Sequence, residues 1–165
     1  MEIFTLRQPQ PNSRHCFVCG LANPFSLHLR FYDNTPGEVI ADTIIGDQYQ
    51  GYPGVVHGGI VSAMLDEAAG RSHMVGTEPR FMYTARLEVR YRQNVPVGQP
   101  LRLVGRVGKA KARTATATSA IYLEDGMLLA EAEVLLVNIP DLDMTPAQLD
   151  ELGWKVYPED IEHIE

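Results

Sequence analysis

The sequence predicts an α+β fold in which an antiparallel sheet wraps around one long central helix. Three observations support this prediction: residues 54–70 form one long run of small and apolar residues, two strand-like runs precede it, and about four follow it. A chain of 165 residues, of which 45% are hydrophobic, suits one domain better than two. We therefore expect a single domain over residues 1–165, with a core at about 16–138, an irregular lead-in at 1–14 and a polar tail at 140–165.

The elements before the helix are predicted to form a hairpin. Residues 26–32 alternate apolar and polar side chains, as a strand with one buried face does, and residues 38–46 form a second such run. The intervening sequence DNTPG is typical of a turn. Residues 47–54 are predicted to be a loop, because glycine and proline interrupt any regular pattern there.

The elements after the helix are predicted to be strands, with one short helix near the end. Residues 84–95 alternate strictly, with Ala85, Leu87, Val89 and Tyr91 on the face expected to be buried. Three further β-like runs cover 100–110, 113–124 and 127–139, with Asp125-Gly126 as the turn between the last two. Residues 145–152 suit a short helix capped by Thr145 with Pro146 in the first position.

Composition excludes several classes of function. The net charge of -7 argues against broad contact with nucleic acid, although a local basic patch can still bind a small anion. No apolar run reaches the length of a membrane span, and the N-terminus lacks the apolar core of a secretion signal. Two cysteines are too few for a disulfide framework. We expect a soluble, cytoplasmic protein with no nucleic-acid or membrane partner.

The central helix carries two adjacent acids on different faces. Asp66 shares its face with small residues, which predicts that another element packs close to it: Gly59, Ser62, Ala63, Ala69, Gly70 and His73. A carboxylate on such a face persists only with a partner or a chemical role; the structural alternative is a backbone group or an arginine of the facing strand. Glu67 has a simpler explanation, a surface or edge ion pair with Arg71.

The glycines at the start of the helix complement Asp66. In the sequence HGG, residues 57–59, the first backbone N–H groups are unpaired at the positive end of the helix dipole, and neither Gly58 nor Gly59 has a side chain to exclude a ligand oxygen. Paired glycines at a helix start also occur for steric reasons alone. Together with an acid two turns later, however, they indicate an oxyanion site.

These residues carry a family resemblance. The sequence GYPGVVHGGIVSAMLDEAAG, set between two predicted strands and four more, resembles the hotdog-fold acyl-CoA thioesterases of the hydroxybenzoyl-CoA and PaaI-like type. The resemblance covers about residues 16–137, and HCFVCGLANPFSLHLRF is similar to the opening of PaaI-like members. It implies that two subunits join their sheets edge to edge with each active site at the interface, in a homodimer or a dimer of dimers.

The resemblance also implies roles for individual residues. Gly58 would donate its N–H to the thioester carbonyl, Asp66 would act as nucleophile or general base, and His57 would help to position the thioester. Thr84 matches a position where relatives carry Ser or Thr that orients water, although an ordinary strand residue is an equal alternative. Some relatives carry Asn where this chain has Gly51; the neighbouring Gln50 is a candidate to bind substrate in its place.

The resulting prediction is an acyl-CoA thioesterase that uses no metal ion or cofactor. The alternative is a non-catalytic hotdog protein that binds acyl-CoA or an acyl carrier. Three alternating basic residues are candidates to bind the nucleotide phosphates of coenzyme A, or else form a solvated strand end: Lys109, Lys111 and Arg113. Cys16 and Cys19 have the spacing of half a zinc site or of a redox pair, but no further cysteine completes it, so we expect both to be dispensable for the chemistry.

Overall fold

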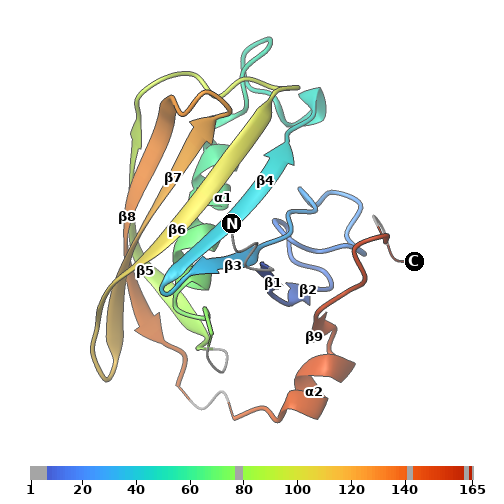
Figure 1. The fold of residues 1–165 in the computed structure, drawn as a ribbon, viewed down its shortest axis with the longest axis vertical. Helices are drawn as coiled ribbons and strands as arrows, with labels where there is room; N and C mark the ends of the chain where they lie inside the picture. The colour runs from blue at the N-terminus through green and yellow to red at the C-terminus, as the bar shows by residue number, and fades with distance from the viewer. Residues whose placement is uncertain (1–6, 77–79, 141–142, 162–163, 165) are drawn as a thin grey trace, which may run out of the picture.

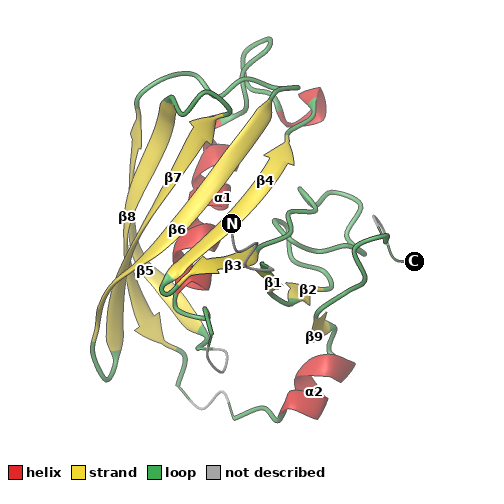
Figure 2. Cartoon of the chain, viewed as in Figure 1, coloured by secondary structure: helices red, strands yellow, loops and turns green. Residues whose placement is uncertain are grey.

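The computed structural model describes residues 7–76, 80–140, 143–161 and 164. Within these ranges seven strands form one antiparallel sheet, and one long helix, α1 (Gly58–Ser72), lies against it (Figure 1). From edge to edge the strand order is β1 (Gln8–Pro9), β3 (Tyr32–Thr35), β4 (Glu38–Ile44), β6 (Pro100–Ala110), β7 (Thr114–Leu123), β8 (Leu128–Asn138) and β5 (Met82–Tyr91). The sheet curves around α1, which contacts β4 to β8 (Figure 2). The predicted α+β architecture is confirmed.

The helix begins at Gly58, within the HGG sequence predicted to start it. Gly54 has a φ of 80°, in the left-handed region, so the backbone there cannot continue into a right-handed helix. His57 then caps α1, with its side chain accepting a hydrogen bond from the N–H of Gly59. The buried side of the helix packs into the core through four apolar residues, three of which form the predicted apolar face: Val61, Met64, Leu65 and Ala68.

The closest approach between helix and sheet lies on this buried side, not on the small-residue face. Gly105 of β6 lies directly against Ala68, and a Cβ at position 105 would overlap the Ala68 carbonyl. By contrast, the small-residue face is half-exposed at Ser62, Ala63 and Asp66. The prediction that another element packs tightly on this face is therefore wrong for the single chain.

The predicted first strand is also wrong in its position. The alternation at 26–32 correctly predicts which side chains are buried: Leu27, Leu29 and Phe31. However, the N–H groups of Leu27 and Leu29 donate to the carbonyls of Phe17 and Val18, at 2.9 Å in both cases. This segment therefore lies against the N-terminal turn, and β3 begins only at Tyr32.

The later strands match their predictions closely. β6, β7 and β8 lie within the runs predicted at 100–110, 113–124 and 127–139. The β7–β8 turn lies where Asp125-Gly126 predicts it, closed by a hydrogen bond from the N–H of Leu123 to the carbonyl of Met127 at 3.0 Å. The earlier turn, between β3 and β4, is shorter than predicted and contains Gly37 with a φ of 75°.

Strand β5 departs from strict alternation at Ala85. Thr84 pairs with Leu136 of β8 and Arg86 with Leu135, so Ala85 is an extra residue without a partner, a β-bulge. Because the bulge reverses the alternation, Thr84 lies on the same face as Leu87 instead of opposite to it. The predicted assignment of Ala85 to the buried face is wrong, and Thr84 takes that place.

Regular structure at 12–13 and 154–155 extends beyond what the sequence predicts. β2 (Asn12–Ser13) pairs with β9 (Trp154–Lys155) in a small second sheet. Before β9, helix α2 (Pro146–Glu151) begins with a capping box at Thr145, as predicted. In the part of the chain that the structure describes, none of the helices has the length and apolar character needed to cross a membrane.

Candidate active site

The start of α1 leaves one backbone donor open. His57 Nδ1 accepts a hydrogen bond from the N–H of Gly59 at 2.9 Å. The backbone carbonyl of His57 accepts hydrogen bonds from the N–H groups of Ile60 and Val61 at 2.9 and 3.1 Å. The N–H of Gly58 has no hydrogen-bond acceptor among the described residues, and Gly58 is exposed. A ligand oxygen can therefore bind the N–H of Gly58 at the positive end of the helix dipole, whereas the N–H of Gly59 is already used.

A cavity of about 470 Å³ lies beside this helix start. Its lining includes the residues that surround the open donor: Gly51, Val56, His57, Gly58, Val61 and Tyr91. Tyr91, at the end of β5, donates its hydroxyl to the carbonyl of Gly58 at 2.7 Å and lies 2.7 Å from the hydroxyl of Ser62. The sequence assigned Tyr91 only to a buried strand face; its position at the helix start depends on how β5 crosses α1, which no local pattern reveals.

Asp66 lies two turns further along the same helix, where the hydroxyl of Thr84 is its one hydrogen-bond donor in the part of the chain that the structure describes. Thr84 donates its Oγ1–H to Asp66 Oδ1 at 2.6 Å, a contact made possible by the bulge at Ala85. Asp66 is half-buried. Burial raises the pKa of Asp66 above its ordinary value, the hydrogen bond from Thr84 opposes this, and the charge of Glu67 adds to it. The structure thus brings two of the predicted site residues together.

Gly58, Ser62 and Asp66 form one polar stripe along α1 that faces β5, since residues four apart lie above one another on a helix. Eight residues at 1.5 Å per residue separate Gly58 from Asp66 by about 12 Å along the axis. One thioester carbonyl cannot contact both groups of the same chain.

The stripe lies beside an open sheet edge. In the described residues β5 pairs only with β8, so its other edge has no strand partner. Side chains at both ends of this ten-residue strand are exposed: Tyr83 at 60% and Tyr91 at 52%. Long unpaired edges of this kind invite pairing with another strand.

The other predicted binding residues lie apart from the stripe. The side-chain carbonyl of Gln50 accepts the N–H of Gly54 at 3.1 Å, so it stabilises the loop before α1. Lys109, Lys111 and Arg113 are exposed on the β6–β7 hairpin. That hairpin lies near the C-terminal end of α1 (Figure 1), whereas the cavity lies beside the start of the helix. Within one chain, the basic residues and the cavity do not meet.

A larger hollow of about 640 Å³ lies at one end of the sheet, over β4, β6 and β7. Its polar lining includes Asp42 and Arg102, whose carboxylate and guanidinium bind each other at 2.7 Å. None of the predicted site residues lines this hollow. The smaller cavity at the start of α1, which His57 and Gly58 line, is therefore the better candidate for an active site.

One segment of the chain is similar to a known protein family. Residues 53–130 match the family model described as thioesterase superfamily, and this segment contains Gly58, Asp66 and Thr84. The match covers just under half of the chain and supports the resemblance to thioesterases that the sequence motifs indicate. No curated protein matches the chain.

Solved structures of thioesterase superfamily proteins share the fold. One such protein, solved by crystallography, is 30% identical to this chain in sequence, and the two structures superpose with a TM-score of 0.70. The match covers 76% of this chain and 61% of that protein, so this chain spans less than two thirds of the length of that protein. A hypothetical thioesterase from Streptococcus pneumoniae TIGR4, solved with coenzyme A, is 16% identical with a TM-score of 0.61, covering 67% of this chain and 85% of that one. A Streptococcus mutans UA159 protein bound to acetyl CoA is 17% identical with a TM-score of 0.58, covering 84% and 93%. The predicted hotdog fold is confirmed.

Proposed function

We propose that this protein is an acyl-CoA thioesterase, which hydrolyses an acyl thioester to a free acid and coenzyme A. The observation that carries this proposal is the polar stripe of α1, with the open N–H of Gly58 at one end and the carboxylate of Asp66, held by Thr84, at the other. The coenzyme A and acetyl CoA bound in two proteins of similar fold support coenzyme A as the carrier.

The separation along the stripe implies that two copies of the chain build each site. If a twofold axis pairs the free edges of two β5 strands, the strands run antiparallel, and the Tyr91 end of one faces the Thr84 end of the other. Within each chain, Tyr91 is hydrogen-bonded to Gly58, and Thr84 is hydrogen-bonded to Asp66. The open N–H of Gly58 in one copy then lies near the carboxylate of Asp66 in the other. One thioester can contact both groups in this arrangement, although they are about 12 Å apart within a single chain.

Each group then has a defined task in hydrolysis. The N–H of Gly58 donates to the thioester oxygen, whose negative charge grows as the carbonyl is attacked, so the bond is stronger in the transition state than in the ground state. In the general-base route, Asp66 of the other copy takes a proton from water, and the new hydroxyl bonds to the carbonyl carbon. The carbon–sulfur bond breaks as the carbonyl re-forms, and the thiolate of coenzyme A receives the proton from Asp66. In the nucleophile route, Asp66 attacks the carbonyl carbon and displaces the thiolate of coenzyme A, which leaves a mixed anhydride. Water then cleaves the anhydride to the free acid and the Asp66 carboxylate, and the remaining proton goes to the thiolate.

The side chains around Asp66 fit this chemistry. Thr84 donates to one carboxylate oxygen and thereby leaves the other free for water or a carbonyl carbon. His57 caps the helix through Nδ1, so in the neutral ring its Nε2–H is directed away from the helix as a further donor for the substrate.

The same twofold pairing assigns a place to the basic hairpin. Arg80 donates to the Lys111 carbonyl at 2.9 Å, so the hairpin lies near the Met82 end of β5. In the paired dimer this end lies beside the Tyr91 end of the other copy. Lys109, Lys111 and Arg113 of one copy would therefore approach the cavity of the other, where cations suit the phosphates of coenzyme A.

A mixing experiment tests both the reaction and the two-copy site. Gly58→Pro removes the N–H at the first helical position, where proline fits, and Asp66→Asn removes the acid. Each variant alone should be nearly inactive towards a panel of acyl-CoAs, assayed by release of free thiol. Unfolding and refolding the two together should restore about a quarter of wild-type activity, since half of the dimers are mixed and each of these has one intact site.

The control is each variant refolded with the double variant, which restores no site. If the mixture stays inactive while mixed dimers are shown by mass spectrometry, the two-copy arrangement is wrong. A wild-type protein that binds acyl-CoA by calorimetry but cleaves no member of the panel would instead support the alternative of a non-catalytic binding protein.

A further inference from the structure

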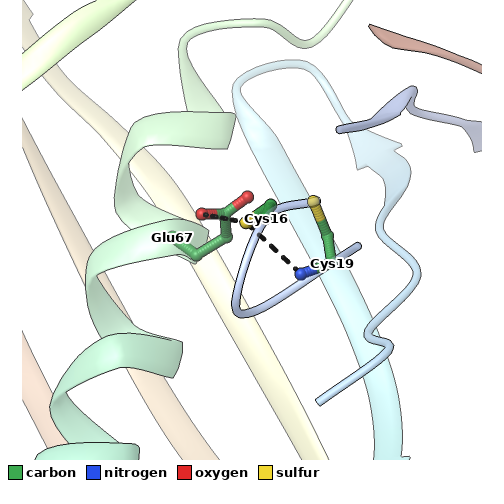
Figure 3. A group of neighbouring side chains, drawn as sticks. All are labelled: Cys16, Cys19 and Glu67. Carbon is green, nitrogen blue, oxygen red and sulfur yellow. Dashed lines mark hydrogen bonds between the residues drawn. The ribbon is translucent and has the colours of Figure 1, made fainter. Parts of the chain in front are cut away.

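A cluster of potential metal ligands lies on the opposite side of α1 from the polar stripe. The N-terminal turn carries Cys16 and Cys19, and the chain returns 51 residues after Cys16 to place Glu67 against them. The two sulfur atoms and a carboxylate oxygen lie within 4.8 Å of one another (Figure 3). Cys16 Sγ is 3.9 Å from Glu67 Oε2. The two cysteines, which have the spacing of half a zinc site, thus lie beside a third potential ligand from the helix, Glu67.

The backbone of this turn is shaped around the sulfur atoms. The N–H groups of Val18 and Cys19 point at Cys16 Sγ at 3.3 and 3.5 Å, and the N–H of Ser13 points at Cys19 Sγ at 3.3 Å. Gly20 closes the turn so tightly that a Cβ there would overlap the backbone of Cys16. A neutral thiol is a weak acceptor, so this convergence of donors suits sulfur atoms that carry negative charge.

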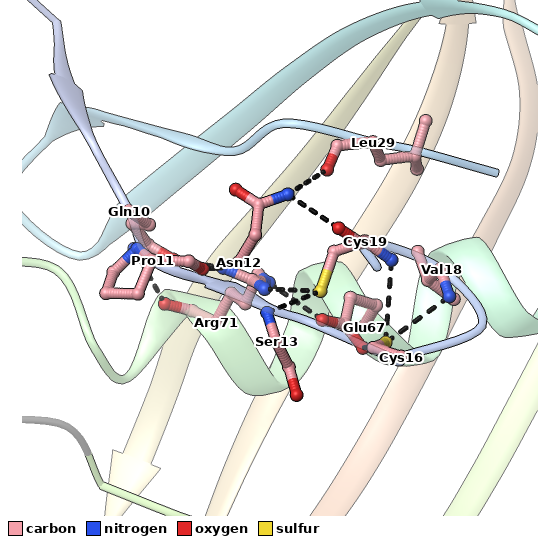
Figure 4. A network of polar contacts seen from close by, with 10 residues as sticks. All are labelled: Gln10, Pro11, Asn12, Ser13, Cys16, Val18, Cys19, Leu29, Glu67 and Arg71. Carbon is pink, nitrogen blue, oxygen red and sulfur yellow. Dashed lines mark hydrogen bonds and ion pairs between the residues drawn. The ribbon is translucent and has the colours of Figure 1, made fainter. Parts of the chain in front are cut away.

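Arg71 adds a charged donor to the same group. Its Nη2 lies 3.1 Å from Cys19 Sγ, and its Nε binds Glu67 Oε1 at 2.8 Å (Figure 4). The Arg71 side chain is only 2% exposed, so its charge must be balanced locally. Glu67 supplies that balance and keeps Oε2 directed at Cys16.

Charge counting favours a divalent cation between the three donors. Arg71 and Glu67 together are neutral, and two thiolates would add two uncompensated negative charges in a largely buried place. A Zn²⁺ ion that replaces both thiol protons leaves the net charge of the cluster unchanged. Zinc bonds of about 2.3 Å to sulfur and 2.1 Å to oxygen hold tetrahedral ligands roughly 3.6 Å apart. The sulfur–oxygen distance of 3.9 Å is close to this value.

We propose that Cys16, Cys19 and Glu67 bind one Zn²⁺ ion per chain, with water in the fourth position and two protons released on binding. No other His, Cys, Asp or Glu joins this group of donors in the described ranges. The ion fastens the N-terminal turn to α1 at the residue after Asp66. This site is independent of thioester hydrolysis, and its test uses no substrate.

Titration of the metal-free protein with Co²⁺ tests the site. Chelator-treated, reduced wild-type protein should bind one Co²⁺ per chain and develop the intense near-ultraviolet absorption of thiolate bound to cobalt, and Zn²⁺ should abolish this band by displacement. Zn²⁺ should also protect both thiols from Ellman's reagent and raise the melting temperature.

Variants assign the ligands. Cys16→Ser and Cys19→Ser should each remove the cobalt band, and Glu67→Gln should weaken Zn²⁺ binding at least about 10-fold. Glu124→Gln is the matched control, since Glu124 is exposed on a different loop, and it should bind as the wild type does.

The wild-type measurements decide the matter even if a variant fails to fold. A folded, reduced wild type that shows no cobalt band and no thiol protection by Zn²⁺ overturns the proposal. So does a native protein whose two cysteines are joined in a disulfide, seen as a mass about 2 Da lower before reduction.

Discussion

The two sides of α1 hold neighbouring carboxylates in very different surroundings. Among the described residues, Asp66 has one polar contact on the side facing β5, the hydroxyl of Thr84 at 2.6 Å, and the sheet edge beside it has no strand partner. On the other side, Glu67 binds Arg71 at 2.8 Å, and the guanidinium lies over the rings of Phe31 at 4.6 Å and Trp154 at 5.3 Å. The carboxylate of Asp66 has no cationic partner within the described residues, whereas that of Glu67 is paired with a buried guanidinium.

This difference separates function from stability along a single helix. Charged groups that are paired inside one chain mainly hold the fold together. The stripe from Gly58 to Asp66 keeps an open donor and a half-buried acid, which are available to a substrate or to a second copy. Substitutions on the two sides should therefore change different measured quantities.

The largest effect should come from Asp66→Asn. Asn can still accept the hydrogen bond from Thr84 but cannot take a proton or attack a carbonyl, so kcat should fall by about 10²–10⁴-fold. Because burial raises the pKa of Asp66, the ionised carboxylate lowers stability, and its removal should not lower the melting temperature. Steady-state kinetics, with acyl-CoA binding by calorimetry as the control, give the answer. Unchanged turnover would place the chemistry at another acid.

Gly58→Pro should follow, with kcat lower by about 10²–10³-fold through loss of one oxyanion donor. Proline suits the first helical position, so the far-ultraviolet circular dichroism should be unchanged. Gly58→Ala is the matched control: it keeps the N–H, and its Cβ would lie 3.6 Å from the Tyr91 hydroxyl, an ordinary contact. Equal losses in the two variants would mean that crowding, and not the N–H, explains the effect.

On the other side of the helix, Glu67→Gln should reduce the free energy of unfolding by about 3 kcal/mol, because it leaves the buried charge of Arg71 without its carboxylate. Urea unfolding with a chelator present measures this without any contribution from a metal ion. Glu88→Gln provides the contrast: its pair with Arg90 at 3.5 Å is more than half exposed, and its loss should cost less than about 1 kcal/mol. Similar losses in both would show that the two sides of the helix differ less than their burial indicates.

The smallest effect should come from Tyr91→Phe, which removes the hydrogen bonds to the Gly58 carbonyl and the Ser62 hydroxyl. A loss of about 0.5–1 kcal/mol in the free energy of unfolding is expected, since these groups are exposed and water replaces the lost bonds. Tyr83→Phe, at the other exposed end of β5, is the control and should be neutral. Thermal unfolding of both variants measures the difference.

The predictable part of the fold is that which local patterns specify. α1 and strands β6 to β8 follow from periodicity, and the α2 cap follows from Thr145 and Pro146. The segment 26–31 has the alternation of a strand, but its N–H groups bond to a turn that periodicity cannot identify. The pairing of β2 with β9 joins segments more than 130 residues apart in the sequence, and two-residue strands give no sequence signal.

The candidate site was predictable to the same extent. HGG and Asp66 lie on one helix, so their relation follows from helical geometry. Thr84 came from the family resemblance alone, because alternation places it on the wrong face until the bulge is known. The sequence predicted a surface or edge pair between Glu67 and Arg71; the pair is confirmed, but its burial depends on the N-terminal turn and on Trp154, which are remote in the sequence.

The bulge at Ala85 makes the site depend on the length of β5 as well as on its composition. Deleting that one residue would let the strand pair regularly with β8 and turn Thr84 away from Asp66, while every residue after position 85 kept its neighbours. During divergence, a three-nucleotide deletion at this codon would therefore disconnect the acid from its hydroxyl without altering either residue. Related sequences that keep both Asp66 and Thr84 but lack the extra residue would belong to proteins that have the same two site residues without the contact between them.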